Sequence, residues 1–316
     1  MQRELNRRTI LQSTTFLAIV ACFLWSTAFA GVKIGLRYLT PLQFAAIRFF
    51  IAGFLVFPLA GNLRSYFRQV GAHWNYVLLI AFLQVVLMYS LFYTGMNRVP
   101  ASLGAMVIGS GPLFIALVAH FSIPNDRMNM KTTFALLLGV VGIVFINLGR
   151  QISNKAGAGE ILGVFILIGN NLVGGLYNVI VKKSQRTIAP LVLSSSSLIL
   201  GGALLFLISL PIEGWQIRTF PTEFYLSLGW LSFLSAAAIS IWFTLLQRPE
   251  VKLSKVNTWK FLIPVLGAVL SWILIRGESP DFFAVSGMLI VGASLLVMNH
   301  EAFFEKRNRK KRKEGH

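Results

Sequence analysis

The sequence contains little charge and almost no cysteine. Charged residues make up 13% of its 316 residues, against roughly 25% in an ordinary soluble domain. Hydrophobic residues make up 55%, and the mean hydropathy is +0.70. Such a chain has too few polar groups to cover a folded soluble surface, which excludes a cytosolic enzyme, a disordered protein and a secreted disulfide scaffold. The one cysteine, Cys22, permits no internal disulfide.

Residues that would carry catalysis are also missing. The 11 acidic residues all fall in loops, tails or the edges of apolar segments. No carboxylate is therefore expected near the bilayer centre, where proton- and sodium-coupled carriers commonly place one. The four histidines are scattered, with no metal-ligand spacing, and no nucleophile lies beside a base. No glycine-rich phosphate motif with a lysine occurs. We predict no catalytic residue, no metal and no cofactor.

Long apolar runs dominate what is present. A spanning helix needs about 20 mostly apolar residues, and continuous hydrophobicity favours helices over a transmembrane barrel. We therefore expect an all-α polytopic membrane protein with ten transmembrane helices. The ten segments are Thr14–Val32, Pro41–Ala60, Trp74–Thr94, Ala101–Ile123, Thr132–Leu148, Ile161–Val181, Pro190–Ile212, Phe224–Leu246, Leu253–Ile275 and Phe282–Met298.

The cations predict the orientation. With the N-terminus in the cytoplasm, 20 Lys and Arg residues fall on the inner side and 7 on the outer side, and Arg48 and Lys260 lie inside spans. This positive-inside bias predicts a multi-pass protein of the inner or plasma membrane with both termini cytoplasmic. The clusters lie between apolar runs and form no single basic face, so nucleic acid is not an expected partner. The tail at 306–313 is expected to meet anionic membrane lipid.

The two halves of the sequence echo each other. A shift of 149 residues places Lys33 on Lys182, Arg37 on Arg186, Pro41 on Pro190 and Gly53 on Gly202; a shift of 152 places Ser102 on Ser254, Pro112 on Pro264 and Asp126 on Glu278. Five spans is an odd number, so the second unit must run inverted, as in many secondary transporters. We expect a first repeat at 1–150, a second at 151–301 and a basic cytoplasmic tail at 302–316. A signal peptide ending near Ala30 is the alternative for the first span, and the repeat argues against it.

Three stretches carry a family resemblance. Trp25 to Phe49 reads WSTAFAGVKIGLRYLTPLQFAAIRF, Lys260 to Glu278 reads KFLIPVLGAVLSWILIRGE, and Gly287 to Val297 reads GMLIVGASLLV. They resemble EamA-type members of the drug/metabolite transporter superfamily. The resemblance implies ten helices, a central cavity and export of amino acids, metabolites or drug-like compounds. Asp126 stands where the family usually has Glu, and we expect it still to cap the following helix.

Arg48 and Lys260 are the two cations embedded in spans. A charge at the centre of a span costs about 2.5–3.5 kcal/mol on insertion scales, so each should face the bundle interior or reach an interface. For Arg48 the structural alternative is a contact with helix-end carbonyls, and for Lys260 it is snorkelling to the cytoplasm. The functional interpretation is that one or both bind an anionic group of a small-molecule substrate.

Aromatic and amide side chains complete the candidate site. Tyr89 and Tyr93 are four residues apart and share a helix face, with Gln84 nearby. Asn171 and Tyr177 make the sixth span polar, and Trp259 does the same for the ninth beside Lys260. Together with Arg48, these residues are our substrate-binding candidates. Core packing and hydrogen bonds between helices are the alternatives.

Pro112 and Pro264 occupy matching positions in the fourth and ninth spans. Proline inside a helix removes a hydrogen bond and bends the helix. The pair is interpreted either as hinges for alternating access or as static kinks.

The sequence therefore predicts a secondary transporter that exports a small organic metabolite, such as an amino acid or organic acid, by alternating access. A membrane-embedded lipid-processing enzyme or an accessory subunit is the alternative. The sequence leaves the oligomeric state open.

Overall fold

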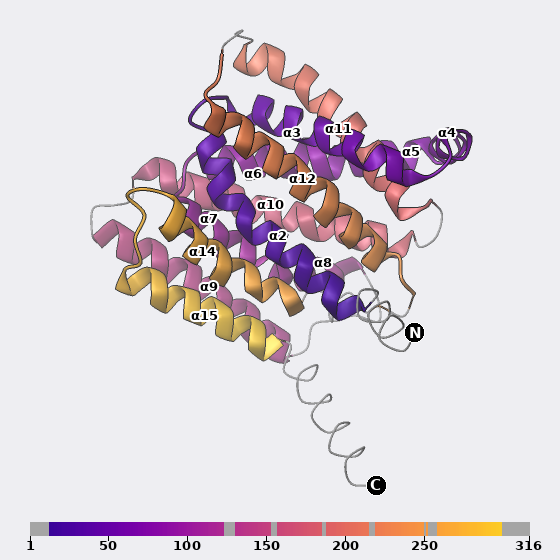
Figure 1. Cartoon of the computed structure of the whole chain (residues 1–316). Helices are drawn as coiled ribbons and strands as arrows, with labels where there is room; N and C mark the ends of the chain where they lie inside the picture. Colours follow the sequence, from indigo (N-terminus) through magenta and orange to yellow (C-terminus); the bar gives the residue numbers. More distant parts are fainter. Residues whose placement is uncertain are drawn as a thin grey trace, which may run out of the picture.

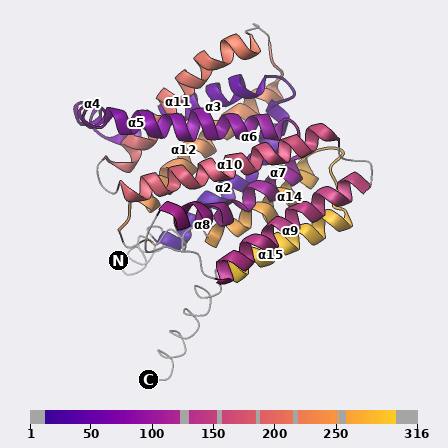
Figure 2. The same cartoon turned by 180° about the vertical axis from the view of Figure 1, so that it is seen from behind.

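The computed structural model describes residues 13–122, 130–152, 157–184, 188–214, 219–249, 251 and 258–298, and all regular structure within them is helical, with no strand. The helices run side by side as a bundle (Figures 1 and 2). They are α2 (Thr14–Gly35), α3 (Pro41–Val56), η1 (Phe57–Ala60), α4 (Leu63–Ala72), α5 (Trp74–Ile80), η2 (Ala81–Met88), α6 (Tyr89–Met96), α7 (Ala101–Gly109), α8 (Gly111–Ser122), α9 (Met130–Ile152), α10 (Ala158–Lys183), α11 (Pro190–Glu213), α12 (Thr222–Leu246), η3 (Thr258–Phe261), α14 (Leu262–Leu274) and α15 (Phe282–Met298). The all-α prediction is confirmed for this part of the chain.

Seven helical stretches in the described residues are long and apolar enough to cross a membrane: Thr14–Gly35, Pro41–Ala60, Trp74–Met96, Ala101–Ser122, Ala158–Lys183, Pro190–Glu213 and Thr222–Leu246. Three shorter apolar helices fall on the fifth, ninth and tenth predicted segments: Thr133–Ile146, Leu262–Leu274 and Phe282–Ser294.

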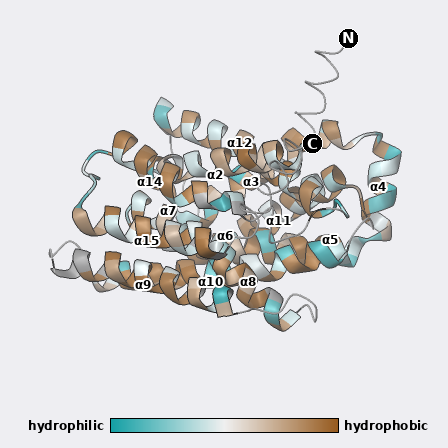
Figure 3. Cartoon of the chain, turned by 90° about the horizontal axis from the view of Figure 1, so that it is seen from below, coloured by the Kyte–Doolittle hydropathy of each residue, from teal (hydrophilic) through white to brown (hydrophobic). Residues whose placement is uncertain are grey.

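The helices consist largely of hydrophobic residues, drawn in brown in Figure 3, and many of these side chains are exposed. Large hydrophobic side chains stand exposed along α3, α9, α10 and α12; Phe54, Leu137, Phe165 and Leu226 are examples. An exposed apolar surface on this scale is stable against lipid hydrocarbon and not against water. The chain is a membrane protein.

Helices far apart in the sequence pack together in the interior. α3 packs on α11, α9 on α15, α2 on α12 and α14, α7 on α14, and α10 on α6 and α8. Glycines permit the closest approach. A Cβ atom added at Gly53 would lie 2.6 Å from the backbone nitrogen of Ile199, and one added at Gly202 would lie 2.6 Å from that of Phe50. The two glycines matched by the sequence repeat thus make equivalent contacts: Gly53 of α3 lies against the backbone of α11, and Gly202 of α11 lies against the backbone of α3.

Two predicted spans are interrupted helices. The third consists of α5, the π-helix η2 and α6, and the fourth breaks between α7 and α8 at Ser110. Pro112 is the second residue of α8, and Pro264 is the third residue of α14, after η3. Pro112 thus follows the break at Ser110 directly, and Pro264 lies within the continuous helical run of η3 and α14.

Carboxylates from the second half of the chain cap helices of the first. Glu213 at the end of α11 accepts from the backbone nitrogens of Leu42 (2.9 Å) and Gln43 (3.0 Å) at the start of α3. Glu278 accepts from the backbone nitrogens of Ala101 (2.6 Å) and Ser102 (2.9 Å) at the start of α7. A negative group stabilises the exposed N–H groups of a helix N-terminus. The predicted cap by Asp126 lies outside the described residues.

The α3–α11 contact predicts the effect of one methyl group. Gly202→Ala should force the two backbones apart and lower the free energy of unfolding by about 1–3 kcal/mol. Gly229→Ala on α12 is the matched control, because no atom lies within 4 Å of its added Cβ and alanine favours a helix. Thermal unfolding of the purified protein in detergent measures both. Equal melting temperatures for the two variants would show that the close approach of α3 and α11 at Gly202 does not contribute to stability.

Candidate substrate site

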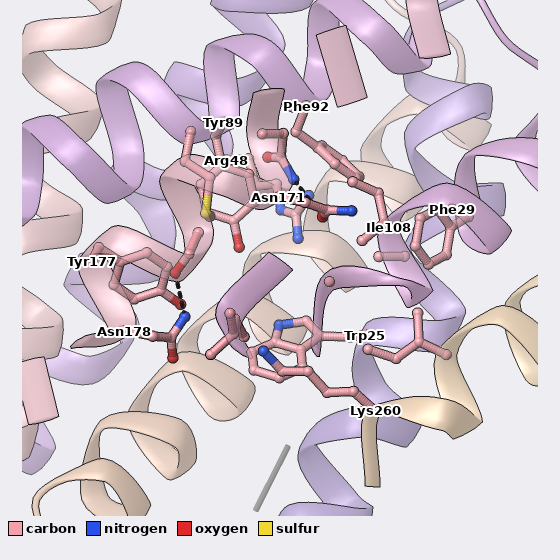
Figure 4. A pocket seen from close by; sticks show the side chains of 17 residues that line it. Trp25, Phe29, Arg48, Tyr89, Phe92, Ile108, Asn171, Tyr177, Asn178 and Lys260 are labelled. Carbon is pink, nitrogen blue, oxygen red and sulfur yellow. Dashed lines mark hydrogen bonds between the residues drawn. The ribbon is translucent and has the colours of Figure 1, made fainter. Parts of the chain in front are cut away.

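A cavity of about 110 Å³ lies in the interior, large enough for several water molecules. Its wall combines aromatic, amide and cationic side chains from both halves of the chain (Figure 4). The lining residues are Trp25, Ala28, Phe29, Arg48, Met88, Tyr89, Phe92, Ile108, Gly111, Ile115, Asn170, Asn171, Gly174, Tyr177, Asn178, Lys260 and Ile263.

One face of α10 supplies the polar side of this wall. Asn170, Asn171, Gly174, Tyr177 and Asn178 recur at the spacing of successive helical turns, so they share a single stripe. Gly174 has no side chain, which leaves space between the amides and Tyr177. Polar side chains on a membrane helix are expected to face protein or a cavity, as they do here.

Arg48 is anchored at one edge of its guanidinium group. The side chain is 2% exposed. Its Nε donates to the carbonyl of Leu231 (3.1 Å) and to the hydroxyl of Ser235 (2.8 Å), both on α12. Its Nη1 donates to the hydroxyl of Tyr93 (2.7 Å), and the guanidinium carbon lies 6.0 Å from the ring centroid of Tyr89. Arg48 therefore joins α3, α6 and α12 while bordering the cavity.

Lys260 lies against two tryptophans. Its Nζ is 4.4 Å from the ring centroid of Trp242 and 5.6 Å from that of Trp25, within the range of a cation–π interaction. The two rings meet edge to face at 5.1 Å. The indole N–H of Trp242 donates to Asn178 Oδ1 (2.7 Å), which fixes the ring beneath the ammonium group.

The asparagines also hold the wall together. Asn171 Nδ2 donates to the carbonyl of Val107 (2.7 Å), at the break between α7 and α8. The same carbonyl accepts from Ser110 Oγ (2.6 Å) and from the Ser110 backbone nitrogen (3.2 Å). Asn171 thus satisfies a carbonyl that the interrupted helix leaves exposed.

Within the residues that the structure describes, neither embedded cation has an acidic partner. Among the described residues, no carboxylate lies within 4.0 Å of Arg48 or Lys260, and none lines the cavity. An ion pair of Arg37 with Glu223 (3.4 Å) lies at the surface. In the part of the chain that the structure describes, no group of three His, Cys, Asp or Glu side chains is placed to hold a metal ion. The cavity is positively charged.

A second cleft of about 520 Å³ lies beyond one end of the cavity. Its lining comes from the ends of four helices that also line the cavity: Lys33 near the end of α2, Arg98 after α6, Glu160 in the first turn of α10 and Ile275 after α14. The cleft lies on the face predicted to be outer. The cavity and the cleft are therefore lined by successive parts of the same four helices.

Five of the eight predicted substrate-binding residues line the cavity: Arg48, Tyr89, Asn171, Tyr177 and Lys260. Tyr93 lies behind Arg48, with its ring 5.6 Å from that of Phe44. Gln84 is buried in η2, where its Oε1 has no hydrogen-bond partner. Trp259 is half-buried against the core. The structure does not bring these last three to the cavity wall.

The prediction omitted most of the apolar wall. Phe29, Met88 and Phe92 border the cavity, and nothing in an apolar segment distinguishes them from lipid-facing residues. Asn178 was detectable, because it completes the polar stripe that begins at Asn170. Trp25 and Phe29, four residues apart on α2, form an aromatic pair on one face.

A bundle of membrane-spanning helices around a cavity lined by aromatic, amide and cationic side chains is the arrangement of a helical membrane transport protein. The chain belongs to the EamA-like transporter family, which matches it twice, at residues 12–148 and 161–300. Membership implies a small-molecule substrate.

Individual relatives are similar over most of their length. The uncharacterized transporter YvbV of Bacillus subtilis (strain 168) is 26% identical over 297 residues, 93% of each chain. A protein named "Probable amino-acid metabolite efflux pump" from Salmonella typhimurium (strain LT2) is 27% identical over 295 residues, 89% of this chain and 93% of its own. The Escherichia coli (strain K12) protein of the same name is 25% identical, over 89% and 91%. All three relatives are named as transporters or efflux pumps.

The fold also matches a known one. A solved crystal structure superposes with a TM-score of 0.68 at 19% identity, covering 90% of this chain and 96% of the other. At that identity the match supports the fold alone.

The shared Val107 carbonyl predicts a non-additive loss. Asn171→Leu and Ser110→Ala each leave the carbonyl one side-chain donor, so each should lower the free energy of unfolding by about 0.6 kcal/mol. The double variant leaves only the longer backbone bond, and its loss should exceed the sum of the two. Unfolding in detergent measures all three; strictly additive losses would show that the two side chains act independently.

Proposed function

We propose that the protein is a secondary transporter that moves a small organic metabolite outward across the cell membrane by alternating access. The observation that carries this proposal is the positively charged, partly aromatic cavity enclosed by helices of both halves. Such a site near the membrane centre, reached in turn from either side as the halves rock, is the arrangement secondary transporters use. The names of the efflux-pump relatives support the outward direction.

The helix contacts support two inverted repeats of five spans each. Helices five spans apart pack on each other in three pairs: α3 with α11, α7 with α14, and α9 with α15. The contact of α2 with α12 corresponds to that of α10 with α6, and the contact of α2 with α14 to that of α10 with α8. If each span is replaced by the corresponding span of the other half, the same pairs of helices are in contact. With the double family match, this favours ten spans, with repeats at 1–150 and 151–301 and a separate tail at 302–316.

The break at Ser110 supports hinges at Pro112 and Pro264. Pro112 follows the break directly, and Pro264 follows the turn from η3 into α14. A Cβ atom added at Gly109 would overlap the Pro264 ring, so the break at Ser110 and the start of α14 are in contact. Each is a place where a span can change direction without breaking a regular helical hydrogen bond.

The charge balance supports an anionic substrate. The five cavity residues Arg48, Tyr89, Asn171, Tyr177 and Lys260 are the proposed binding set. Two cations without an acidic partner attract anions and disfavour cations in a low-dielectric cavity.

The proposed orientation has both termini in the cytoplasm of a multi-pass protein in the cell membrane. The loop after α14 should then face outward and the start of α4 inward. In a Cys22→Ala background, a cysteine at Ser279 should react with an impermeant maleimide on intact cells, and one at Ser65 should react only after lysis. The opposite pattern would reverse the topology.

Transport itself is tested in proteoliposomes. Vesicles with purified protein should release a labelled organic acid or amino acid from a metabolite panel faster than protein-free vesicles. Lys260→Gln should slow the release of the transported compound about tenfold, the loss of one charge contact. Lys183→Gln is the control, because Lys183 is exposed and donates to the Ser122 carbonyl (2.6 Å) outside the cavity. Release at the protein-free rate across the whole panel would refute the proposal.

A further inference from the structure

The two cations of the cavity keep hydrogen-bond donors free. Arg48 donates through Nε to Leu231 and Ser235 and through one N–H of Nη1 to Tyr93. Among the described residues, no acceptor lies within hydrogen-bond distance of its Nη2. Lys260 Nζ lies over the rings of Trp25 and Trp242, and in the described part of the chain it donates to no hydrogen-bond acceptor. A guanidinium group has five N–H donors and an ammonium group three. The cavity therefore offers several charged donors that the protein does not use.

The acceptors on the wall are neutral: they are the amide oxygens of the asparagines and the hydroxyls of Tyr89 and Tyr177. Asn178 Oδ1 accepts from Trp242 Nε1, and no carboxylate lines the cavity. The carbonyl of Val107, at the break beside the cavity, already has three donors. A substrate ammonium group would bring three more donors and a third positive charge to a site with two. No wall carboxylate would balance that charge.

The aromatic part of the wall favours a ligand whose remaining atoms form an apolar or aromatic group. Trp25, Phe29, Tyr89 and Phe92 present rings to the cavity, as Figure 4 shows. Burying an apolar or aromatic group against them gains the hydrophobic contribution that a compact hydrophilic ion cannot supply.

We propose that the cavity takes organic carboxylates that lack an amine and carry an apolar or aromatic body, in preference to the α-amino acids of the same skeleton. The proposal rests on the proposed role of the cavity as the substrate site. The carboxylate meets the free N–H groups of Arg48 or Lys260, and the body lies against the rings. An α-amino acid places its ammonium group next to that carboxylate, in the field of the same cations.

Three probes with one skeleton test the proposal: 3-phenylpropionate, phenylalanine and 2-phenylethylamine. Binding to the purified protein in detergent, by calorimetry, should be about tenfold tighter for 3-phenylpropionate than for phenylalanine, with phenylethylamine weakest. An aliphatic set of 4-methylpentanoate, leucine and 3-methylbutylamine should give the same order. Phenylalanine binding as tightly as 3-phenylpropionate would overturn the proposal, as would the failure of both carboxylates to bind.

Variants connect the preference to its cause. Lys260→Gln should weaken 3-phenylpropionate binding by about tenfold and reduce the ratio of its affinity to that of phenylalanine. Lys183→Gln should change neither the affinity nor the ratio. An unchanged advantage in Lys260→Gln and in Arg48→Gln would overturn the assignment to these cations; the comparison of probes on the unaltered protein stands even if a variant misfolds.

Flux distinguishes this proposal from the function on which it rests. Carboxylate binding without release from proteoliposomes would refute transport and leave the ligand preference intact. Equal release of phenylalanine and 3-phenylpropionate, with equal affinity, would leave transport intact and refute the preference.

Discussion

In the hydrocarbon of a bilayer, a polar group has to find its partner inside the protein, and much of this structure follows from that constraint. The spans are helical because a helix satisfies its own backbone. Where a helix is interrupted, at Ser110, a side chain of α10 supplies the missing donor. Where a helix begins, a carboxylate of another helix meets its N–H groups. Arg48 survives burial because α12 and α6 provide its acceptors.

Several of these partners come from the other half of the chain. Glu213 and Glu278 belong to the second half and cap α3 and α7 of the first. In the contact between α3 and α11, each helix contributes a glycine that lies against the backbone of the other. Each half thus supplies hydrogen-bond partners to the other, and the cavity is lined by helices that these contacts hold together.

Much of the fold, and part of the site, could be predicted from the sequence. Long apolar runs predict the helices, and Arg48 and Lys260 stand out because a charge is conspicuous in such a run. Tyr93 shows the limit: it shares a helix with Tyr89, yet its hydroxyl meets Arg48 from behind the cavity, and only the position of α3 decides that. Phe29 and Phe92 escaped prediction because an apolar wall and a lipid-facing surface use the same residues.

The anchoring of Arg48 has a consequence for how the protein is made. Its acceptors on α12 come 183 and 187 residues later in the chain. At about 5–20 residues per second, the ribosome reaches them roughly 10–40 s after Arg48 has emerged. During that interval the guanidinium group has neither Leu231 nor Ser235 to donate to. The insertion machinery or lipid headgroups have to shelter this charge until the second half arrives, so α3 depends on such help early in synthesis.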